Sequence, residues 1–381
     1  MGLKKSLLLL RMNSLRVNKK LLCAALHKAG INDPLQSNML GEVYFMLSLR
    51  CNLRCKVCAW WGKSGPCRDK AFLRKYAPVL TMKDLMHFAA QILPYNPRRV
   101  TFSGGEPLFN KKWYYLARFF KENSVKVSLT TNGVFLSKEF ERIIEVVDEV
   151  NLSLGGPPSI LSLIRDNRTQ HFKSIMQGLA KLSSFRENNN NKPGLRVLYT
   201  ISGLSYKYMN ELVEFMENSD IAIDRYHFQH LMFIDESTFH KQKEVLSKEF
   251  NIKHCDLWRG YVFPPMNLDF DLFKKEVRRL KEMGNVSFSP DLKAEELVSY
   301  YSLNRGALRY NKYCTAPWHQ IDIMPNGDIY TCHDLFIGNL RESCFRDIWN
   351  GKISRKLRLR LTQKLFPGCK GCFYHYSERN R

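Results

Sequence analysis

Six short segments rich in β-branched and aromatic residues alternate with helical patterns up to residue 233, and this alternation most constrains the fold of the chain. The strand candidates are residues 43–49, 99–103, 126–131, 149–154, 195–201 and 225–233. The helical stretches between them are residues 82–93, 112–121, 138–146, 169–182 and 206–218. Strands that alternate with helices build βα units around a parallel sheet. The sequence therefore predicts an α/β fold.

The composition is that of a soluble enzyme. Hydrophobic residues make up 44% of the 381 positions, enough for one large domain plus a smaller appended one. The longest apolar run near the start, residues 7–10, is far too short to cross a bilayer, and no cleavable signal sequence is recognisable. We therefore expect a cytoplasmic protein. Residues 1–40 carry seven Lys or Arg against one acidic residue, which predicts a basic, partly helical N-terminal extension.

The formal net charge of +23 is large. Part of the excess lies in residues 1–40 and part in residues 352–364, where six Lys or Arg stand against no acidic residue. Such a charge favours an anionic substrate or partner through long-range attraction. A solvated charged surface is the default interpretation of either stretch. Nucleic acid, a phosphorylated metabolite and an anionic lipid headgroup are the alternatives.

Three cysteines, Cys51, Cys55 and Cys58, follow the first predicted strand with the spacing C-x3-C-x2-C. A cubane [4Fe–4S] cluster is normally held by four thiolates, so a loop that offers three leaves one iron free to bind a small molecule. Structural zinc sites usually show C-x2-C pairs that complete a four-ligand tetrahedron. Disulfide frameworks belong to short secreted domains. The triad therefore indicates an iron–sulfur cluster with one open coordination position.

The motif S-G-G-E-P at residues 103–107 follows the second predicted strand, and its consecutive glycines let the backbone approach a ligand closely. Together with the cysteine triad, it resembles the radical S-adenosylmethionine (SAM) superfamily. The resemblance implies a partial (β/α)6 TIM-like barrel, which we place at residues 41–310. It also implies that the open iron binds SAM and that an electron from the cluster cleaves SAM to a 5′-deoxyadenosyl radical, which abstracts hydrogen from the substrate. A donor such as flavodoxin or ferredoxin would supply that electron.

The same resemblance assigns the residues that contact SAM. In the family the glycine-rich motif binds the amino group of SAM, and this motif comprises Gly104, Gly105, Glu106 and Pro107. Positions that match Ser153 and Arg165 contact its ribose or carboxylate in related enzymes, and an arginine suits a carboxylate because it can donate two parallel hydrogen bonds. All of these residues lie near the ends of predicted strands, where parallel barrels carry their functional groups.

One position departs from the family pattern. The residue before the third cysteine is usually aromatic and packs near the adenine, whereas in this chain it is Val57. Trp60 and Trp61 follow closely and are candidates to replace that contact.

The sixth predicted strand carries Tyr226-His227-Phe228-Gln229-His230, in which successive side chains point to opposite faces. One set must point into the barrel, where a substrate would bind. We name His227 and Gln229 as candidate catalytic residues. The alternative is that the histidines are structural.

A second group of cysteines lies near the C-terminus. Cys314 and Cys332 flank an alternating stretch broken by Asn-Gly, which predicts a β-hairpin that holds the two thiols close together. Cys369 and Cys372 add a C-x2-C pair after a helix. Four thiols arranged in two pairs suit either a zinc ion or a [4Fe–4S] cluster.

The spacing of this group resembles the cluster-binding extension called SPASM. The full extension needs further cysteines after the C-x2-C pair, and the chain ends at Arg381 without them. The shortened form, called a twitch domain, holds one auxiliary [4Fe–4S] cluster and is the better match. We therefore expect a small domain of a β-hairpin plus a helix at residues 311–381. Its auxiliary cluster would be held by Cys314, Cys332, Cys369 and Cys372.

The remaining cysteines have no partner at ligand spacing. We interpret Cys344 as a core residue and Cys23, Cys67 and Cys255 as structural thiols. Cys67 lies near enough to the triad loop to be exposed.

The resemblance fixes the mechanism better than the substrate. Twitch-bearing relatives include dehydrogenases that act on alcohol groups of sugar-like metabolites and the enzyme that rearranges GTP in molybdenum-cofactor synthesis. Four cysteines predict a fully ligated auxiliary cluster, which favours electron transfer and hence a two-electron oxidation of a small metabolite.

Two other functions remain open. The first is modification of a peptide or protein, although the residues before the first strand are too few for the winged-helix module that often holds a leader peptide. The second is a non-catalytic basic iron–sulfur or zinc protein that binds nucleic acid. That function leaves the motif at residues 103–107 and the βα repetition unexplained, so a nucleic-acid partner is not expected.

Overall fold

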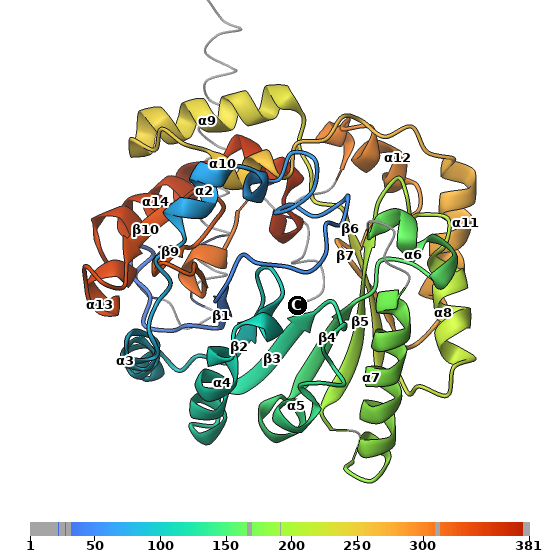
Figure 1. Ribbon diagram of the computed structural model, residues 1–381. Helices are drawn as coiled ribbons and strands as arrows, with labels where there is room; N and C mark the ends of the chain where they lie inside the picture. Colours follow the sequence, from blue (N-terminus) through green and yellow to red (C-terminus); the bar gives the residue numbers. More distant parts are fainter. Residues whose placement is uncertain are drawn as a thin grey trace, which may run out of the picture.

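The computed structural model describes residues 22, 27, 32–165, 170–190, 192–308 and 313–375 and shows an open α/β barrel (Figure 1). In the described part of the chain one sheet of ten strands has the order β10-β9-β8-β1-β2-β3-β4-β5-β6-β7. In this order, each strand from β8 and β1 on to β7 pairs in parallel with its neighbour. Strands β9 and β10 add antiparallel pairs at the edge next to β8. The predicted α/β fold with a partial parallel barrel is confirmed.

Six strands correspond to the predicted segments, and four others follow them in the chain. The first six are β1 (Glu42–Phe45), β2 (Arg99–Phe102), β3 (Lys126–Thr131), β4 (Glu149–Ser153), β5 (Gly194–Ile201) and β6 (Arg225–His230). The others are β7 (Val286–Ser289), β8 (Gln320–Ile323), β9 (Asp328–Tyr330) and β10 (Phe336–Asn339). The predicted strands 43–49 and 225–233 were too long. Their last apolar residues are buried outside the sheet, so hydrophobicity there reflects burial and not strand pairing.

Helices lie along the outer side of the barrel strands from β2 to β7 (Figure 1). The predicted helices correspond to α3 (Met82–Ile92), α4 (Lys112–Glu122), α5 (Phe140–Val146), α7 (Gln170–Glu187) and α8 (Met209–Glu217). The remaining α-helices are α2 (Lys70–Lys75), α6 (Pro158–Ile164), α9 (Glu236–Phe250), α10 (Asp256–Arg259), α11 (Phe270–Lys281), α12 (Glu296–Tyr301), α13 (Phe345–Trp349) and α14 (Lys352–Gln363). None of the described helices combines the length and the apolar composition that crossing a membrane requires. Most of the predicted N-terminal extension, together with Cys23 and Thr169, lies outside the described residues.

Strand β8 joins the predicted C-terminal domain to the barrel. It pairs in parallel with β1 over four residues, with Asp322 opposite Tyr44. The hairpin of β8 and β9 predicted around the Asn-Gly turn is present, and it continues the barrel sheet. The domain boundary predicted between residues 310 and 311 therefore does not separate two sheets.

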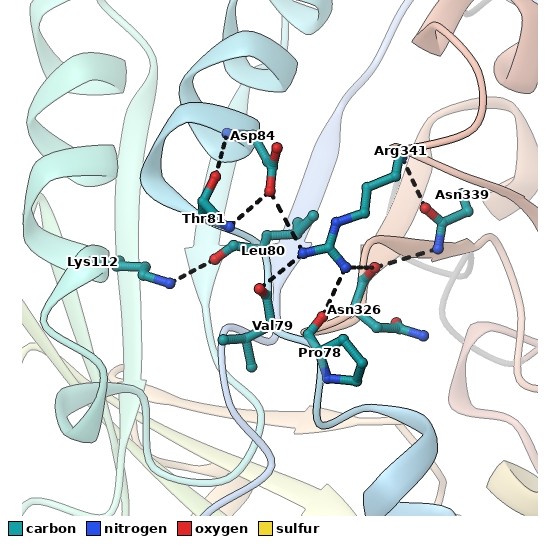
Figure 2. A network of polar contacts seen from close by, with 9 residues as sticks. All are labelled: Pro78, Val79, Leu80, Thr81, Asp84, Lys112, Asn326, Asn339 and Arg341. Atoms are coloured by element: carbon teal, nitrogen blue, oxygen red, sulfur yellow. Dashed lines mark hydrogen bonds and ion pairs between the residues drawn. The ribbon is translucent and has the colours of Figure 1, made fainter.

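Arg341 fastens the C-terminal hairpin to the barrel (Figure 2). Its guanidinium donates to the carbonyl oxygens of Pro78 and Val79, each at 2.9 Å, and lies 3.6 Å from the Asp84 carboxylate. Asp84 is itself fixed because it forms a capping box with Thr81 at the start of α3. The strands that follow β8 and the segment before α3 are therefore held in one arrangement.

Candidate active site

The three cysteines of the first motif lie in the loop after β1 and are partly buried. The backbone N–H groups of Leu53 and Trp61 donate to the sulfurs of Cys51 and Cys58, each at 3.4 Å. Burial raises the pKa of all three thiols, that of Cys55 to about 11. Thiols that ionise poorly on their own are taken as thiolates by a metal centre. The donor set of this loop therefore fits an iron–sulfur cluster held by three cysteines.

Trp61 braces this loop. Its indole Nε1 donates to the carbonyl oxygen of Leu49 at 2.8 Å. The guanidinium of Arg54 lies 3.7 Å from the centre of the Trp61 ring and donates to the carbonyl oxygen of Cys51 at 2.7 Å. Trp61 is therefore part of the loop's own packing. Of the two tryptophans considered as replacements for the aromatic residue missing at Val57, only Trp60 faces the interior cavity described below.

The glycines of the second motif let the loop after β2 lie directly on the cysteine loop. The N–H of Gly105 donates to the carbonyl oxygen of Ser48 at 3.0 Å, and that of Glu106 donates to the carbonyl oxygen of Arg50 at 2.8 Å. A Cβ atom on Gly105 would come within 2.1 Å of the Arg50 oxygen. Gly104 has a φ of +113°, which side chains rarely adopt. These glycines therefore let the loop after β2 approach the backbone of the cysteine loop closely.

The Glu106 carboxylate bridges two loops. It accepts hydrogen bonds from the Thr131 hydroxyl at 2.7 Å, from the N–H of Asn132 at 2.9 Å and from the N–H of Leu108 at 3.3 Å. Burial raises its pKa from 4.5 to about 7. These three bonds use most of the acceptor capacity of the carboxylate. A direct hydrogen bond from the amino group of SAM to Glu106 remains a prediction.

Asn132, in the loop after β3, was not predicted as a site residue. Its side-chain amide donates to Asn52 Oδ1 at 2.8 Å and reaches the sulfur of Cys51 at 3.8 Å. Because Glu106 holds the backbone of Asn132, the glycine-rich loop and the β3 loop together orient a donor toward the cysteines.

Arg165 is buried, with 5% of its surface exposed. Its guanidinium donates to the carbonyl oxygens of Asn132, at 3.2 Å, and Ser153. It also lies near enough to Cys55 to lower the pKa of that thiol. Its position beside the triad fits a carboxylate ligand. Ser153 contributes its carbonyl oxygen to this arrangement, and the predicted role of its hydroxyl remains a prediction.

A cavity of about 410 Å³, which we call the inner cavity, fills the interior of the barrel. The parallel strands contribute inward-facing polar residues: Tyr44, Thr101, Thr130, Asn151, Arg196, His227, Gln229, Ser289 and Asp322. Such a lining offers hydrogen bonds on several sides to one small ligand. Arg196, one of these lining residues, forms an ion pair with Glu149 and donates to its carboxylate at 2.9 Å.

His227 and Gln229 line the inner cavity, as the alternation along the sixth strand predicted. His230, on the opposite face, is fully buried, and its Nδ1 lies 2.9 Å from the Tyr301 hydroxyl. The Nδ1 of His227 lies 2.9 Å from the Ser287 hydroxyl. Burial lowers the pKa of His227 to about 4, so this side chain faces the cavity as a neutral imidazole at pH 7. Any catalytic role of His227 and Gln229 remains a prediction.

Asp322 is a second site residue that sequence reasoning missed. It lies on β8 and lines the inner cavity beside Tyr44. Burial raises the pKa of Asp322 to about 7 and that of Tyr44 to about 12. A carboxyl with such a pKa can accept and release a proton near neutrality. Asp322 faces the barrel interior because β8 pairs with β1, and this pairing of distant segments cannot be predicted from a local sequence pattern.

The four C-terminal cysteines line the same inner cavity: Cys314, Cys332, Cys369 and Cys372. Burial raises the pKa of Cys332 well above its ordinary value, and the other three thiols raise it further. In the described part of the chain no three Cys, His, Asp or Glu side chains converge closely enough to hold a single metal ion. The four thiols border one shared space, and their chemistry fits a cluster of several iron atoms.

Residues 256–260, which comprise α10 and Gly260 and which we call the α10 segment, pack between the two cysteine groups. A Cβ atom on Gly260 would lie 1.8 Å from the carbonyl oxygen of Ala59, next to the triad. Asp334, two residues after Cys332, accepts hydrogen bonds from the N–H groups of Leu257 and Trp258, each at 2.9 Å. The α10 segment therefore contacts both cysteine loops and holds their separation.

Among the remaining described cysteines, one expectation is wrong and two are confirmed. Cys344 is exposed and donates to Asp347 at 3.0 Å, so its assignment to the core was wrong. Cys67 has only 1% of its surface exposed because it packs under Phe72 and Tyr76, so it is a buried thiol despite its position near the triad. Cys255 is buried as expected and donates to Asp334 at 3.2 Å.

Comparisons with known families match both cysteine groups. The model of the radical SAM superfamily matches residues 46–218, and the model of the SPASM domain, an iron–sulfur cluster-binding domain, matches residues 314–373. The first match includes Cys51, Cys55 and Cys58, and the second includes the four C-terminal cysteines.

Similar curated proteins have several activities. A probable GTP 3′,8-cyclase of Methanococcus maripaludis is 28% identical over 114 residues, which are 29% of this chain and 35% of that protein. The chain thus spans about a third of the length of that relative. A tungsten-containing aldehyde ferredoxin oxidoreductase cofactor-modifying protein of Pyrococcus furiosus is 21% identical over 350 residues, 87% of this chain and 86% of that protein.

A solved structure shares the fold. The crystal structure of Streptococcus suis SuiB superposes with a TM-score of 0.55 at 17% identity and covers 87% of this chain and 70% of SuiB. SuiB has also been solved bound to S-adenosylmethionine and bound to the precursor peptide SuiA. At this identity the likeness concerns the fold alone.

Proposed function

Because this chain belongs to the radical SAM superfamily and carries a C-terminal iron–sulfur cluster-binding domain, we propose that it oxidises a small hydroxylated metabolite by two electrons inside the inner cavity. Membership of the family makes it an enzyme that uses SAM, a [4Fe–4S] cluster and an auxiliary iron–sulfur cluster. The observation that carries the proposal is the inner cavity itself. One space is lined by polar groups of the barrel strands, among them a carboxyl that titrates near neutrality, and by the four auxiliary cysteines.

Cys51, Cys55 and Cys58 would hold the first cluster, and Cys314, Cys332, Cys369 and Cys372 the second. When bound, these groups and SAM supply abstraction of a hydrogen atom and acceptance of one electron. Arg165 offers its guanidinium to the carboxylate of SAM, and Asn132 orients the cysteine loop through Cys51. The α10 segment packs over the triad at Ala59 and excludes water from that side.

The residues of the inner cavity would bind the substrate and handle its proton. Hydroxyl groups on the substrate find partners in Thr101, Asn151 and Gln229, which come from three different strands. An alcohol that becomes a carbonyl compound must lose its hydroxyl proton. Asp322 Oδ is the acceptor that we assign to it, because its carboxylate form is populated at neutral pH and faces the cavity. His227, being neutral, can accept a hydrogen bond without competing for that proton.

The first test is anaerobic reconstitution. Iron and sulfide are counted, and 5′-deoxyadenosine formed from SAM with dithionite is measured. Two clusters correspond to about eight irons per chain. A panel of polyols and sugar phosphates deuterated at carbon then reports the substrate class, since a true substrate transfers deuterium to 5′-deoxyadenosine.

Deuterium transfer from a secondary carbinol position, with one carbonyl product for each SAM cleaved, would support the proposal. Transfer from a peptide or from a carbon without a hydroxyl group would contradict it. Zinc in place of iron, with no cleavage of SAM, would contradict the assignment of both clusters.

A further inference from the structure

A second cavity lies on the outside of the protein, between α9, the end of α14 and the short helix η6 (Pro367–Gly371). Its volume is about 470 Å³, and we call it the outer cavity. Among its described lining residues four are basic and none is acidic: Lys241, Arg360, Lys364 and Lys370. The first belongs to α9 and the others to the segment that carries Cys369 and Cys372.

The inner and outer cavities share a wall. Phe366 and Cys369 line both of them. Cys369 is one of the four thiols assigned to the auxiliary cluster. At Cys369 that site therefore borders both the cavity that would hold the substrate and a basic surface that opens to solvent.

The basic side chains of the outer cavity do not form a pre-organised binding site for a small anion. Glu249 lies 2.7 Å from Arg360 and 3.9 Å from Lys364. Arg360 also covers the ring of Phe366 at 4.4 Å, so it takes part in the packing of the wall. Lys241, Lys364 and Lys370 are exposed. Exposed ammonium groups on flexible stems respond to charge more than to shape, which favours an acidic protein surface over a phosphate group.

The outer side of α14 extends this basic surface. The helix contains no acidic residue, and Lys352, Arg355 and Lys356 are exposed. Between them Ile353 and Leu359 are 41% and 46% exposed. A helix of this length spans about 18 Å. Electron-transfer pairs form small interfaces, which bury less than about 1,200 Å², so a surface of limited extent is sufficient for such a partner.

We propose that the outer cavity and the exposed side of α14 dock an acidic one-electron carrier protein of the ferredoxin or flavodoxin class, which removes the electron left on the auxiliary cluster after each turnover. This inference rests on the proposed function. The secondary alcohol loses one hydrogen atom to C5′ of the deoxyadenosyl group, one proton to Asp322 and one electron to the auxiliary cluster. The oxidised carrier takes that electron and is itself reduced by one electron, so the oxidation balances.

The test measures electron transfer from the enzyme to a purified acidic [2Fe–2S] ferredoxin. Enzyme reconstituted with both clusters is reduced with dithionite, desalted and mixed with oxidised ferredoxin in a stopped-flow spectrophotometer. The test variant carries Lys241→Glu, Lys364→Glu and Lys370→Glu. At an ionic strength of about 0.01 M, where charges act over about 30 Å, we expect its second-order rate constant to fall at least about tenfold. We expect the difference to shrink as salt is added.

The matched control reverses three exposed lysines on other elements: Lys126→Glu, Lys138→Glu and Lys275→Glu. It changes the net charge by the same amount, so general repulsion affects both variants equally. A variant with glutamine at positions 241, 364 and 370 shows whether a loss follows charge or folding, and iron content is compared in each preparation. We expect the glutamine variant to keep its iron and to lose part of the rate.

Equal rate constants in the test and control variants would overturn the proposal. It would also be overturned if the test variant lost binding of inorganic phosphate or of a short RNA, measured by calorimetry, while electron transfer to ferredoxin stayed as in the wild type. Formation of 5′-deoxyadenosine with dithionite checks the proposed function separately. If the wild type cleaves SAM but transfers electrons to ferredoxin no faster than the test variant, docking fails and the proposed function stands.

Discussion

Replacing Glu106 by glutamine should stabilise the protein at alkaline pH and not at acidic pH. The Glu106 carboxyl is fully buried, and burial raises its pKa from 4.5 to about 7. The folded protein therefore holds this proton more tightly than the unfolded chain does. The resulting stability is fully present below about pH 4.5 and is lost as the pH rises through about 7. Each tenfold difference in proton affinity is worth about 1.4 kcal/mol, so ionisation of Glu106 costs the folded state about 3 kcal/mol.

Glutamine avoids this cost but gives up one acceptor. Its amide oxygen can accept from the N–H of Asn132, and its amide nitrogen can donate to the Thr131 hydroxyl, which can rotate. The bond from the N–H of Leu108, the longest of the three at 3.3 Å, is then lost. A lost hydrogen bond of this kind costs about 1 kcal/mol. The variant should therefore be about 2 kcal/mol more stable than the wild type near pH 8 and about 1 kcal/mol less stable near pH 4.5.

Urea unfolding of the cluster-free protein under reducing conditions, followed by tryptophan fluorescence between about pH 5 and pH 8, measures this difference. Glu282→Gln, at an exposed position, is the control for adding an amide without changing a buried charge. If the stabilities of the wild type and of Glu106→Gln ran parallel over this range, burial would not be what sets the pKa of Glu106, and the reasoning would fail.

Three further predictions concern the two cysteine groups and the segment between them. Cys55→Ala should abolish 5′-deoxyadenosine formation and keep about four irons per chain. Cys332→Ala should lose irons at the C-terminal site and keep some SAM cleavage that is not coupled to product formation. Equal loss of SAM cleavage in both variants would contradict this division of roles. Gly260→Ala sets a methyl group 1.8 Å from the Ala59 oxygen and should lower both the melting temperature and SAM cleavage, unlike the control Gly284→Ala, which meets no atom within 4 Å. Asp322→Asn should slow product formation about a hundredfold and remove its rise through about pH 7, as a pH–rate profile would show; an unchanged profile would exclude Asp322 as the proton acceptor.

The parts of the fold that the sequence predicted well depend on local patterns. The βα alternation placed six strands and the helices between them, because burial repeats with a period of 2 in a strand and 3.6 in a helix. The same period correctly set His227 and Gln229 on one face of the sixth strand and His230 on the other. Errors appeared where an apolar run is buried by a loop, as at the ends of β1 and β6.

The parts that could not be predicted depend on contacts between distant segments. Cys344 was assigned to the core because it lies where the related domains carry an apolar residue, yet it is exposed at the position before α13. Glu106 could be named as part of a motif, but its partners Thr131 and Asn132 lie on another loop, so its bridging role required the structure.

The pairing of β8 with β1 shows why the substrate space and the auxiliary site cannot be treated as separate modules. A strand that looks like half of an isolated hairpin supplies Asp322 to the barrel interior and carries the chain on to Cys332. Under the proposed function, the proton acceptor and one thiol of the electron acceptor would thereby belong to one β-hairpin region, since Cys332 follows the end of β9 by two residues. Removal of a proton and of an electron from one hydroxyl-bearing carbon needs this juxtaposition. In the proposed reaction, the wall formed by Phe366 and Cys369 would give the electron, but not the substrate, a short way to the outer surface.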